Sequence, residues 1–339
     1  MRRTIVDVAR AAGVSTATVD RVLNGRDGVR ALTRDRVIAA ARETGYLAVA
    51  SAAVPTRERL QLDFVLQSGP NTFMDLLAGH LAGVGAARAA EADVRVHRVD
   101  GFSPEILAAT LRELRPASAG VGIIALDHPI VREAIREAAA NGLPVLTMVS
   151  DVANVPRVGY VGIDNRAAGR LAGHLLGRFV PGSAGEVALF AGSLRYRGHE
   201  EREMGFRHIL ADEFPKLRIV ELREVRDDLE RGYDEAKGLL AAHPGLRGIY
   251  SIGAGNHGIA RALEEAGRGG EVVFIGHEIT EHTRRFLLAG TMDAVIDQNP
   301  RVEAREAVDR LLRAARGQPD PDPAAVRIHA IFRENIPEV

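Results

Sequence analysis

Residues 16–24 place hydrogen-bonding side chains and a methyl group at the spacing of one helical face. In this stretch, TATVDRVLN, helical periodicity turns Val19, Val22 and Leu23 toward a core. The opposite face suits base edges in a DNA groove, because amide and guanidinium groups hydrogen-bond to bases and a methyl contacts thymine. That face holds Thr16, Ala17, Asp20, Arg21 and Asn24.

The flanking residues predict how this helix is positioned. Thr4 begins a capping-box pattern before residues 5–12, and Gly13 can take the left-handed conformation that ends a helix. Ser15 is a suitable N-cap for residues 16–24. The two helices are therefore expected to be joined by a tight turn.

A third helix completes this unit. Thr33 is its expected cap and Gly45 its expected end. The arrangement predicts a helix-turn-helix domain over residues 1–46, whose second helix enters the major groove of DNA. A three-helix bundle that binds protein is the alternative that periodicity leaves open.

The composition is typical of a soluble globular chain with more than one domain. Of the 339 residues, 46% are hydrophobic and 26% are charged, and no cysteine is present. No apolar run reaches the roughly 18 residues that span a bilayer. MRRTIVDVAR has no apolar signal segment, so we expect a cytoplasmic location and no membrane partner.

Charge is distributed unevenly along the chain. Residues 1–60 contain 11 arginines and 6 acidic residues, a net charge of +5, whereas the remainder carries 33 basic and 39 acidic residues. The basic segment is therefore the part expected to meet a polyanion.

The first segment resembles a known DNA-binding family. TIVDVARAAGVSTATVDRVLNG is similar to the headpiece of the lactose-repressor (LacI/GalR) family of bacterial transcription regulators, and the similarity continues through RVIAAARETGYL. The resemblance implies that Thr16, Ala17 and Arg21 contact bases. It also implies that a second set approaches the DNA backbone or caps helices: Thr4, Ser15, Thr18 and Asn24.

Asp20 departs from the family pattern, which usually has a serine near a phosphate at this position. Two interpretations are open. Asp20 can pair with a nearby arginine and orient it, or it can accept a hydrogen bond from a cytosine amino group. We favour the first and expect Asp20 to adjust operator specificity.

Residues 47–60 are the expected hinge between two domains. The family usually has a proline where this chain has Ala48, and a leucine that wedges into the minor groove where it has Pro55. A short helix could still form on DNA, with Leu47 or Val54 as the wedge. A plain linker is the alternative.

Predicted strands and helices alternate over residues 61–339. LDFVLQ, VRVHRV and VGIIAL are predicted strands, and a second series of similar length starts at EVALFAG. The alternation predicts an α/β fold of parallel sheets flanked by helices in two lobes. VGIDNRAAGRLAGHLL, EEREMGFRHIL and AVIDQNP resemble landmarks of the type I periplasmic-binding-protein fold, the effector domain of LacI-family repressors.

The resemblance implies that the chain crosses between the lobes near Asp164, near Gly290–Ile296 and near residues 320–325. AAVRIHAIFREN would be the closing strand. The two lobes of this effector-binding and dimerisation domain would comprise residues 61–163 with 291–322, and residues 164–290 with 323–339.

Polar residues at predicted strand ends are candidates for binding a small ligand, because ligands bind beyond the carboxyl ends of parallel strands. The family places a polar group and an aromatic platform at Asn71 and Phe73, and a hydroxyl-binding arginine at Arg202. Glu278 replaces the family's frequent aspartate, and His277 replaces a commoner apolar residue. The full set is Asn71, Phe73, Asp127, His128, Ser150, Asp151, Arg202, Asn256, His277, Glu278 and Gln298.

A glycine pattern in the same region indicates a different function. Gly253, Gly255 and Gly258 form GxGxxG between a predicted strand and helix, with Glu278 twenty residues later. This is the spacing of a dinucleotide fingerprint, so an NAD(H)-linked redox sensor or oxidoreductase is the alternative function. HEITEH lacks the HExxH spacing of a metal site. We expect no catalytic residues, no cofactor and no metal.

Together, these features predict a sequence-specific DNA-binding transcription regulator, with repression as the family's commoner mode. Two headpieces on a pseudo-palindromic operator require a homodimer. The resemblance implies that a small polar effector, most simply a sugar or polyol, binds between the lobes and changes the affinity for DNA.

Overall fold

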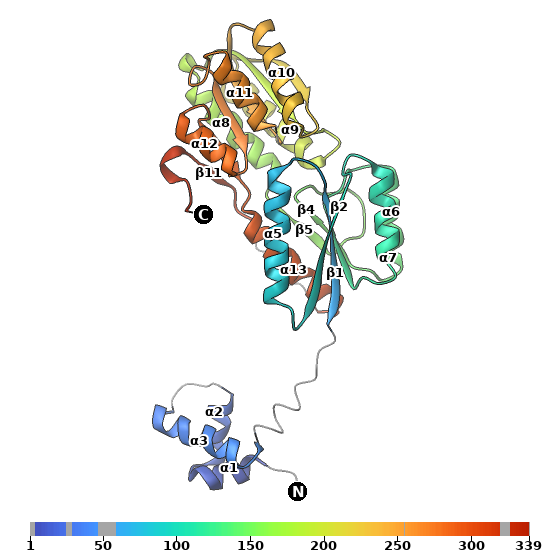
Figure 1. The fold of residues 1–339 in the computed structure, drawn as a ribbon, viewed down its shortest axis with the longest axis vertical. Coiled ribbons are helices and arrows are strands. Elements are labelled where there is room, and N and C mark those ends of the chain that lie inside the picture. The colour runs from blue at the N-terminus through green and yellow to red at the C-terminus, as the bar shows by residue number, and fades with distance from the viewer. Residues whose placement is uncertain (1–3, 25–28, 47–58, 254, 319–325, 339) are drawn as a thin grey trace. The chain divides into compact units, whose positions relative to one another are not determined.

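The chain divides into two compact units, residues 1–58 and residues 59–339. The structure is a computed structural model that describes residues 4–24, 29–46, 59–253, 255–318 and 326–338 (Figure 1). Leu47 and Val54, the two candidate wedge residues, lie outside the described residues. Within the described part of the chain, no helix is long and apolar enough to cross a membrane.

The first unit is a bundle of three helices, α1 (Ile5–Ala12), α2 (Thr16–Leu23) and α3 (Ala31–Glu43). Val8, Val19 and Val37 form its fully buried centre. Gly13 ends α1 with φ +61°. Ser15 begins α2, and its hydroxyl accepts a hydrogen bond from the Thr18 amide at 3.2 Å. The helix-turn-helix arrangement therefore follows from local caps and one apolar stripe on each helix.

The third helix begins earlier than the sequence predicts. Arg30 is its N-cap, and the Arg30 carbonyl accepts a hydrogen bond from the Arg34 amide at 3.0 Å. Thr33, the expected cap, lies inside the first turn of α3. Any residue with extended backbone can begin a helix, and the buried positions fix which face is inward rather than where the helix starts.

The second unit contains two sheets, each covered by helices on both faces. The first has the strand order β2-β1-β3-β4-β5, and all its pairings are parallel. Helices α5 and α13 pack together on one face, and α6 and α7 pack together on the other (Figure 1). The elements are β1 (Leu60–Gln67), α5 (Thr72–Ala87), β2 (Ala92–Val99), α6 (Pro104–Leu114), β3 (Gly120–Ile123), α7 (Pro129–Ala140), β4 (Val145–Met148), β5 (Gly159–Val161) and α13 (Pro300–Ala315).

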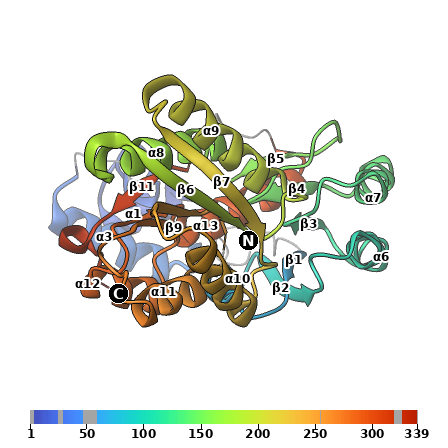
Figure 2. The same cartoon turned by 90° about the horizontal axis from the view of Figure 1, so that it is seen from above.

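The second sheet has the order β11-β10-β9-β8-β6-β7, with only β11 antiparallel among these strands. Helices α8 and α9 lie on one side of it, and α10 and α11 lie on the other (Figure 2). Its elements are α8 (Asn165–Phe179), η1 (Pro181–Ser183), β6 (Gly185–Ala191), α9 (Arg197–Glu213), β7 (Leu217–Glu224), α10 (Leu229–Ala242), β8 (Leu246–Ser251), α11 (Asn256–Glu265), β9 (Val273–His277), α12 (Glu281–Ala289), β10 (Ala294–Asp297), β11 (His329–Ile331) and η2 (Arg333–Asn335).

The chain crosses back to the first lobe later than the sequence predicts. The expected crossing near Gly290–Ile296, and the assignment of residues 291–322 to the first lobe, are wrong for β10. Ile296 pairs with His277 of β9 in the second sheet. The buried run AVID joins that sheet before Pro300 begins α13 on the first sheet. The expected crossing at residues 320–325 lies wholly among residues that the structure does not describe.

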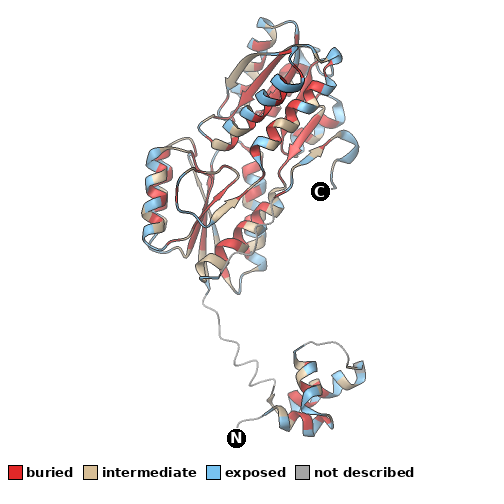
Figure 3. Ribbon diagram, turned by 180° about the vertical axis from the view of Figure 1, so that it is seen from behind, coloured by how far each residue is buried: buried red, intermediate tan, exposed pale blue. Residues whose placement is uncertain are grey.

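Burial follows this layered arrangement. The central strands are buried, and the helices carry alternating buried and exposed faces (Figure 3). Helices α8 and α9 approach closely, because a Cβ atom at Gly169 would overlap the Arg202 carbonyl oxygen. This contact fixes the position of Arg202, whose side chain enters the pocket described next.

Candidate effector pocket and DNA-contacting helix

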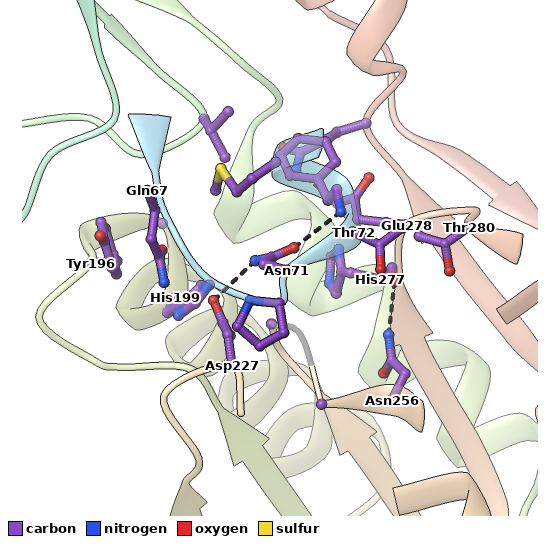
Figure 4. Close-up of a pocket in the computed structure, with 18 of the residues that line it drawn as sticks. Gln67, Asn71, Thr72, Tyr196, His199, Asp227, Asn256, His277, Glu278 and Thr280 are labelled. Atoms are coloured by element: carbon purple, nitrogen blue, oxygen red, sulfur yellow. Dashed lines mark hydrogen bonds between the residues drawn. The ribbon is translucent and has the colours of Figure 1, made fainter. Parts of the chain in front are cut away.

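A pocket lies where the carboxyl ends of strands from both sheets meet (Figure 4). Its space, including the part open to solvent, is about 820 Å³. The first lobe contributes the start of α5 and the residues at the end of β4. The second lobe contributes the starts of α9, α11 and α12 and the loop before α10. This is the position at which parallel α/β sheets bind ligands.

Arg202 of α9 is held by three hydrogen bonds in the pocket. Its Nε donates to Asn165 Oδ1 at 2.7 Å, Nη1 donates to the Ile252 carbonyl at 2.9 Å, and Nη2 donates to Gln298 Oε1 at 3.3 Å. Only 3% of its surface is exposed. These bonds tie α9 to the start of α8 and to the residues that follow β8 and β10, so the Arg202 guanidinium is held in one orientation.

Glu278 follows β9 and carries a strained backbone, with φ +67°. Its Oε1 accepts a hydrogen bond from Gln298 Nε2 at 2.7 Å, while Oε2 is buried and has no partner among the described residues. Burial, with a further contribution from the Asp297 carboxylate, raises the pKa of Glu278 from 4.5 to about 8. Glu278 is therefore largely protonated at neutral pH.

His277 and Asn256 present two further polar atoms without partners in the described chain. His277 Nε2 and the Tyr250 hydroxyl share a hydrogen bond at 2.8 Å, and Asn256 Nδ2 donates to the His277 carbonyl at 3.0 Å. His277 Nδ1 and Asn256 Oδ1 are buried and unsatisfied. Burial and the Arg202 charge hold the pKa of His277 well below its usual value, so the ring is neutral. Buried polar atoms without partners indicate a ligand or water at this position.

The first lobe contributes Asn71, which caps α5. Its Oδ1 accepts from the Phe73 amide at 3.1 Å, and its Nδ2 donates to Asp227 Oδ2 in the second lobe at 3.0 Å. Ser150 makes a second contact between the lobes, because its Oγ accepts from the Gly198 amide at 3.1 Å. The pocket is thus closed by hydrogen bonds that run from one lobe to the other.

The structure brings together most of the predicted effector residues. The pocket lining includes Asn71, Phe73, Ser150, Arg202, Asn256, His277, Glu278 and Gln298. Each lies at a strand end or on the first turns of a helix that follows one, except Arg202, which reaches the pocket from the second turn of α9.

Asp127, His128 and Asp151 do not line the pocket, contrary to prediction. Asp127 Oδ1 accepts a hydrogen bond from Arg132 at 2.6 Å, and His128 caps α7. Asp151 accepts hydrogen bonds from Thr147 and Arg157, each at 2.6 Å. All three follow central strands, but their polar groups form hydrogen bonds with nearby arginines or with an amide at the start of a helix.

The polar lining residues that the sequence did not indicate as effector-binding include Gln67, Tyr196, His199 and Asp227. Gln67 ends β1, so the rule that ligands bind beyond strand ends could have found it. Tyr196 and Asp227 lie in loops whose direction depends on tertiary packing, and His199 lies in the first turn of α9. Burial and the Arg202 charge lower the pKa of His199 to about 3, so this ring is also neutral.

The predicted DNA-contacting residues form the outer face of α2 and its cap. Thr16, Ala17, Arg21 and Asn24 are exposed. Asp20 Oδ1 accepts a hydrogen bond from Asn24 Nδ2 at 2.8 Å along the same helix. Pairing of Asp20 with an arginine stays a prediction.

The remaining residues of this predicted set are at helix caps. The Thr4 amide donates to Asp7 Oδ2 at 2.9 Å, and the hydroxyls of Ser15 and Thr18 share a hydrogen bond at 2.9 Å. Thr4, Ser15 and Thr18 therefore fix the ends of α1 and α2, whatever contacts they make with DNA.

Both units match families of known proteins. Residues 4–48 match the family described as "Bacterial regulatory proteins, lacI family", and residues 64–319 match the family described as "Periplasmic binding protein domain". The chain belongs to the periplasmic-binding-protein domain family, whose model covers most of it, and its N-terminal segment matches the lacI family of bacterial regulatory proteins. Its second unit has the periplasmic-binding-protein fold, as the sequence predicts.

Several relatives of this chain are sugar-related proteins. The ribose operon repressor of Bacillus subtilis is 28% identical over 80% of this chain and 78% of its own length. The D-ribose/D-allose-binding protein of Pseudomonas aeruginosa is 28% identical over 48% of this chain, which spans about half (50%) of that relative. The glucose-galactose binding protein GanP from Geobacillus stearothermophilus has a similar structure, with a TM-score of 0.76 and 23% identity, over 83% of this chain and 100% of its own.

Proposed function

We propose that this lacI-family protein is a transcriptional repressor whose affinity for operator DNA is controlled by a monosaccharide bound in the pocket. The observation that carries the proposal is the group of buried polar atoms on Asn256, His277 and Glu278, beside Arg202, that have no partner among the described residues. A hydroxylated ring can donate to some of these atoms and accept from others. The names of the relatives agree with this ligand class.

The electrostatics of the pocket favour a neutral ligand. His277 and His199 are neutral, and burial also favours the neutral form of Glu278. Arg202 already donates to three neutral protein acceptors, so three of its five N–H donors are engaged without an anion. A neutral sugar or polyol therefore fits better than a phosphate or a carboxylate.

Ligand binding would be coupled to DNA through the two lobes. The pocket is lined from both lobes, so a ligand that contacts both stabilises the closed arrangement by its difference in affinity for the closed and open states. We propose that the protein acts in the cytoplasm as a homodimer on a pseudo-palindromic operator. Thr16, Ala17 and Arg21 would contact bases from α2.

The first test is thermal unfolding of the full chain with D-ribose, D-allose, D-arabinose, D-xylose, D-galactose, inositol and NAD(H). A ligand at about a hundred times its Kd adds roughly 2.7 kcal/mol to the free energy of unfolding, which is a shift of several degrees. A shift with one sugar is the expected result, and Arg202→Ala should remove it. A shift with NAD(H) alone would instead support the dinucleotide alternative.

The second test measures binding to operator DNA over a range of salt concentrations, with and without the stabilising sugar. We expect steep salt dependence and a change of affinity on adding the sugar. Asp20→Ser should change the ranking of operator variants. A uniform gain in affinity for all DNA would show that Asp20 is only repulsive.

A further inference from the structure

Asp227 is a buried carboxylate that enters the pocket from the second lobe, and only 3% of its surface is exposed. It lies in the loop between β7 and α10, where Arg226 and Asp227 both have left-handed backbone, with φ of +51° and +57°. The loop is fixed to β6 by two backbone hydrogen bonds, from the Val225 amide to Ala191 and from the Arg226 amide to Gly192. Residues without glycine's freedom hold this conformation only where their surroundings enforce it.

Two glycines make room for the Asp227 carboxylate. A Cβ atom at Gly192 would overlap Asp227 Oδ1, and a Cβ atom at Gly253 would lie 3.1 Å from it. Gly253 is the first glycine of the GxGxxG pattern. Gly253 thus permits close approach of the Asp227 side chain. The sequence pattern alone suggested that it permits close approach of a pyrophosphate.

Asn71 brings an amide from the first lobe to this carboxylate. Its Nδ2 donates to Asp227 Oδ2 at 3.0 Å, and its Oδ1 is oriented by the Phe73 amide. An amide nitrogen has two hydrogens, so one N–H of Asn71 is left beside the carboxylate. In Figure 4, Asn71 lies between Asp227 on one side and His277 with Glu278 on the other.

We propose that Asp227 is a specificity-determining residue that, with Asn71, binds one hydroxyl group of the effector. The hydroxyl would accept a hydrogen bond from the Asn71 amide and donate one to the Asp227 carboxylate. One lobe supplies each partner, so this hydroxyl is held across the cleft. A ligand that lacks the hydroxyl forms neither of these two hydrogen bonds, so it should bind less tightly. The inference rests on the proposed monosaccharide effector.

The test is calorimetric titration of the full-length wild type, Asp227→Asn and Asp227→Ala. The titrants are the sugar that stabilises the wild type, chosen from D-ribose, D-allose and D-arabinose, and each of its monodeoxy analogues. Asp228→Asn is the matched control, because Asp228 is the exposed neighbour that caps α10 by accepting from the Arg231 amide at 2.8 Å. Circular dichroism and the melting temperature of each variant verify that it is folded.

We expect Asp227→Asn to lower the affinity for the parent sugar by roughly 10- to 100-fold. Asp228→Asn should leave that affinity unchanged. For one deoxy analogue, the one that lacks the hydroxyl bound by Asp227, wild type and Asp227→Asn should have the same affinity. An equal loss for every analogue would show that Asp227 only joins the lobes, and an unchanged affinity would also overturn the inference. If the wild type binds no sugar, the proposed effector class fails, and the inference fails with it.

Discussion

Replacing Glu278 with glutamine should increase stability at alkaline pH. Glu278 is buried, its Oε1 accepts from Gln298 Nε2 at 2.7 Å, and its other oxygen has no partner in the described chain. Ionisation places a negative charge beside the Asp297 carboxylate at a buried position. Glutamine keeps the size and the neutral character of the protonated acid, so it removes the cost of that charge.

The expected magnitude follows from the pKa of Glu278, which is about 8 in the folded chain and 4.5 for an unperturbed glutamate. Because the folded state holds the proton more tightly, its contribution to stability is complete below pH 4.5 and is lost as the pH rises through 8. The two pKa values differ by about 3.5, and each pH unit corresponds to about 1.4 kcal/mol. The stability of Glu278→Gln relative to wild type should therefore rise by about 5 kcal/mol between these limits.

The assay is urea unfolding followed by far-ultraviolet circular dichroism at several pH values from 4.5 to 8.5, since the chain has no tryptophan to report by fluorescence. The quantity compared is the free energy of unfolding of Glu278→Gln minus that of wild type. Glu281→Gln is the control, because Glu281 is exposed on the first turn of α12. A difference that stays constant over this pH range would refute the argument that Glu278 is buried and protonated.

Three further predictions concern packing, capping and DNA contact. Gly169→Ala should lower the free energy of unfolding by about 1–3 kcal/mol through overlap with the Arg202 carbonyl, whereas Gly79→Ala on the exposed face of α5 should raise it by about 0.4–1 kcal/mol. Equal effects in urea unfolding would argue against close packing of α8 and α9. Ser15→Ala removes the bond from the Thr18 amide and should destabilise the first unit by about 1 kcal/mol, and an unchanged headpiece melting curve would contradict this. Arg21→Ala should weaken binding to the preferred operator, and to no other DNA, by about 1–3 kcal/mol. An equal loss of binding free energy on unrelated DNA would contradict base contact.

The sequence predicted elements whose causes are local. Helical periodicity and caps identified α1 and α2, because Ser15 and Gly13 act on residues within one turn. The alternation of strands and helices predicted both parallel sheets. Strand ends then located Asn71, His277 and Glu278, since the carboxyl ends of parallel strands share one edge.

Features that depend on distant partners were not predictable in this way. Asp127 and Asp151 occupy the same kind of position as Glu278, but Arg132 and Arg157 lie within hydrogen-bond reach of them. Asp227 follows an edge strand and reaches the pocket only because β6 and two glycines fix its loop. The assignment of β10 to the second sheet rests on pairing with β9, which no local pattern encodes.

The position of α13 has a consequence for synthesis of the chain. All five strands of the first sheet are complete by Val161, yet α13, which packs on β1, β3, β4 and β5, begins at Pro300. During translation, the apolar surface that Leu311 and Val308 later bury must remain uncovered until nearly the whole chain has left the ribosome. A chain that terminates before Pro300 would contain every strand of that sheet and still expose the part of one face that α13 covers, so such truncations should be bound by chaperones or degraded.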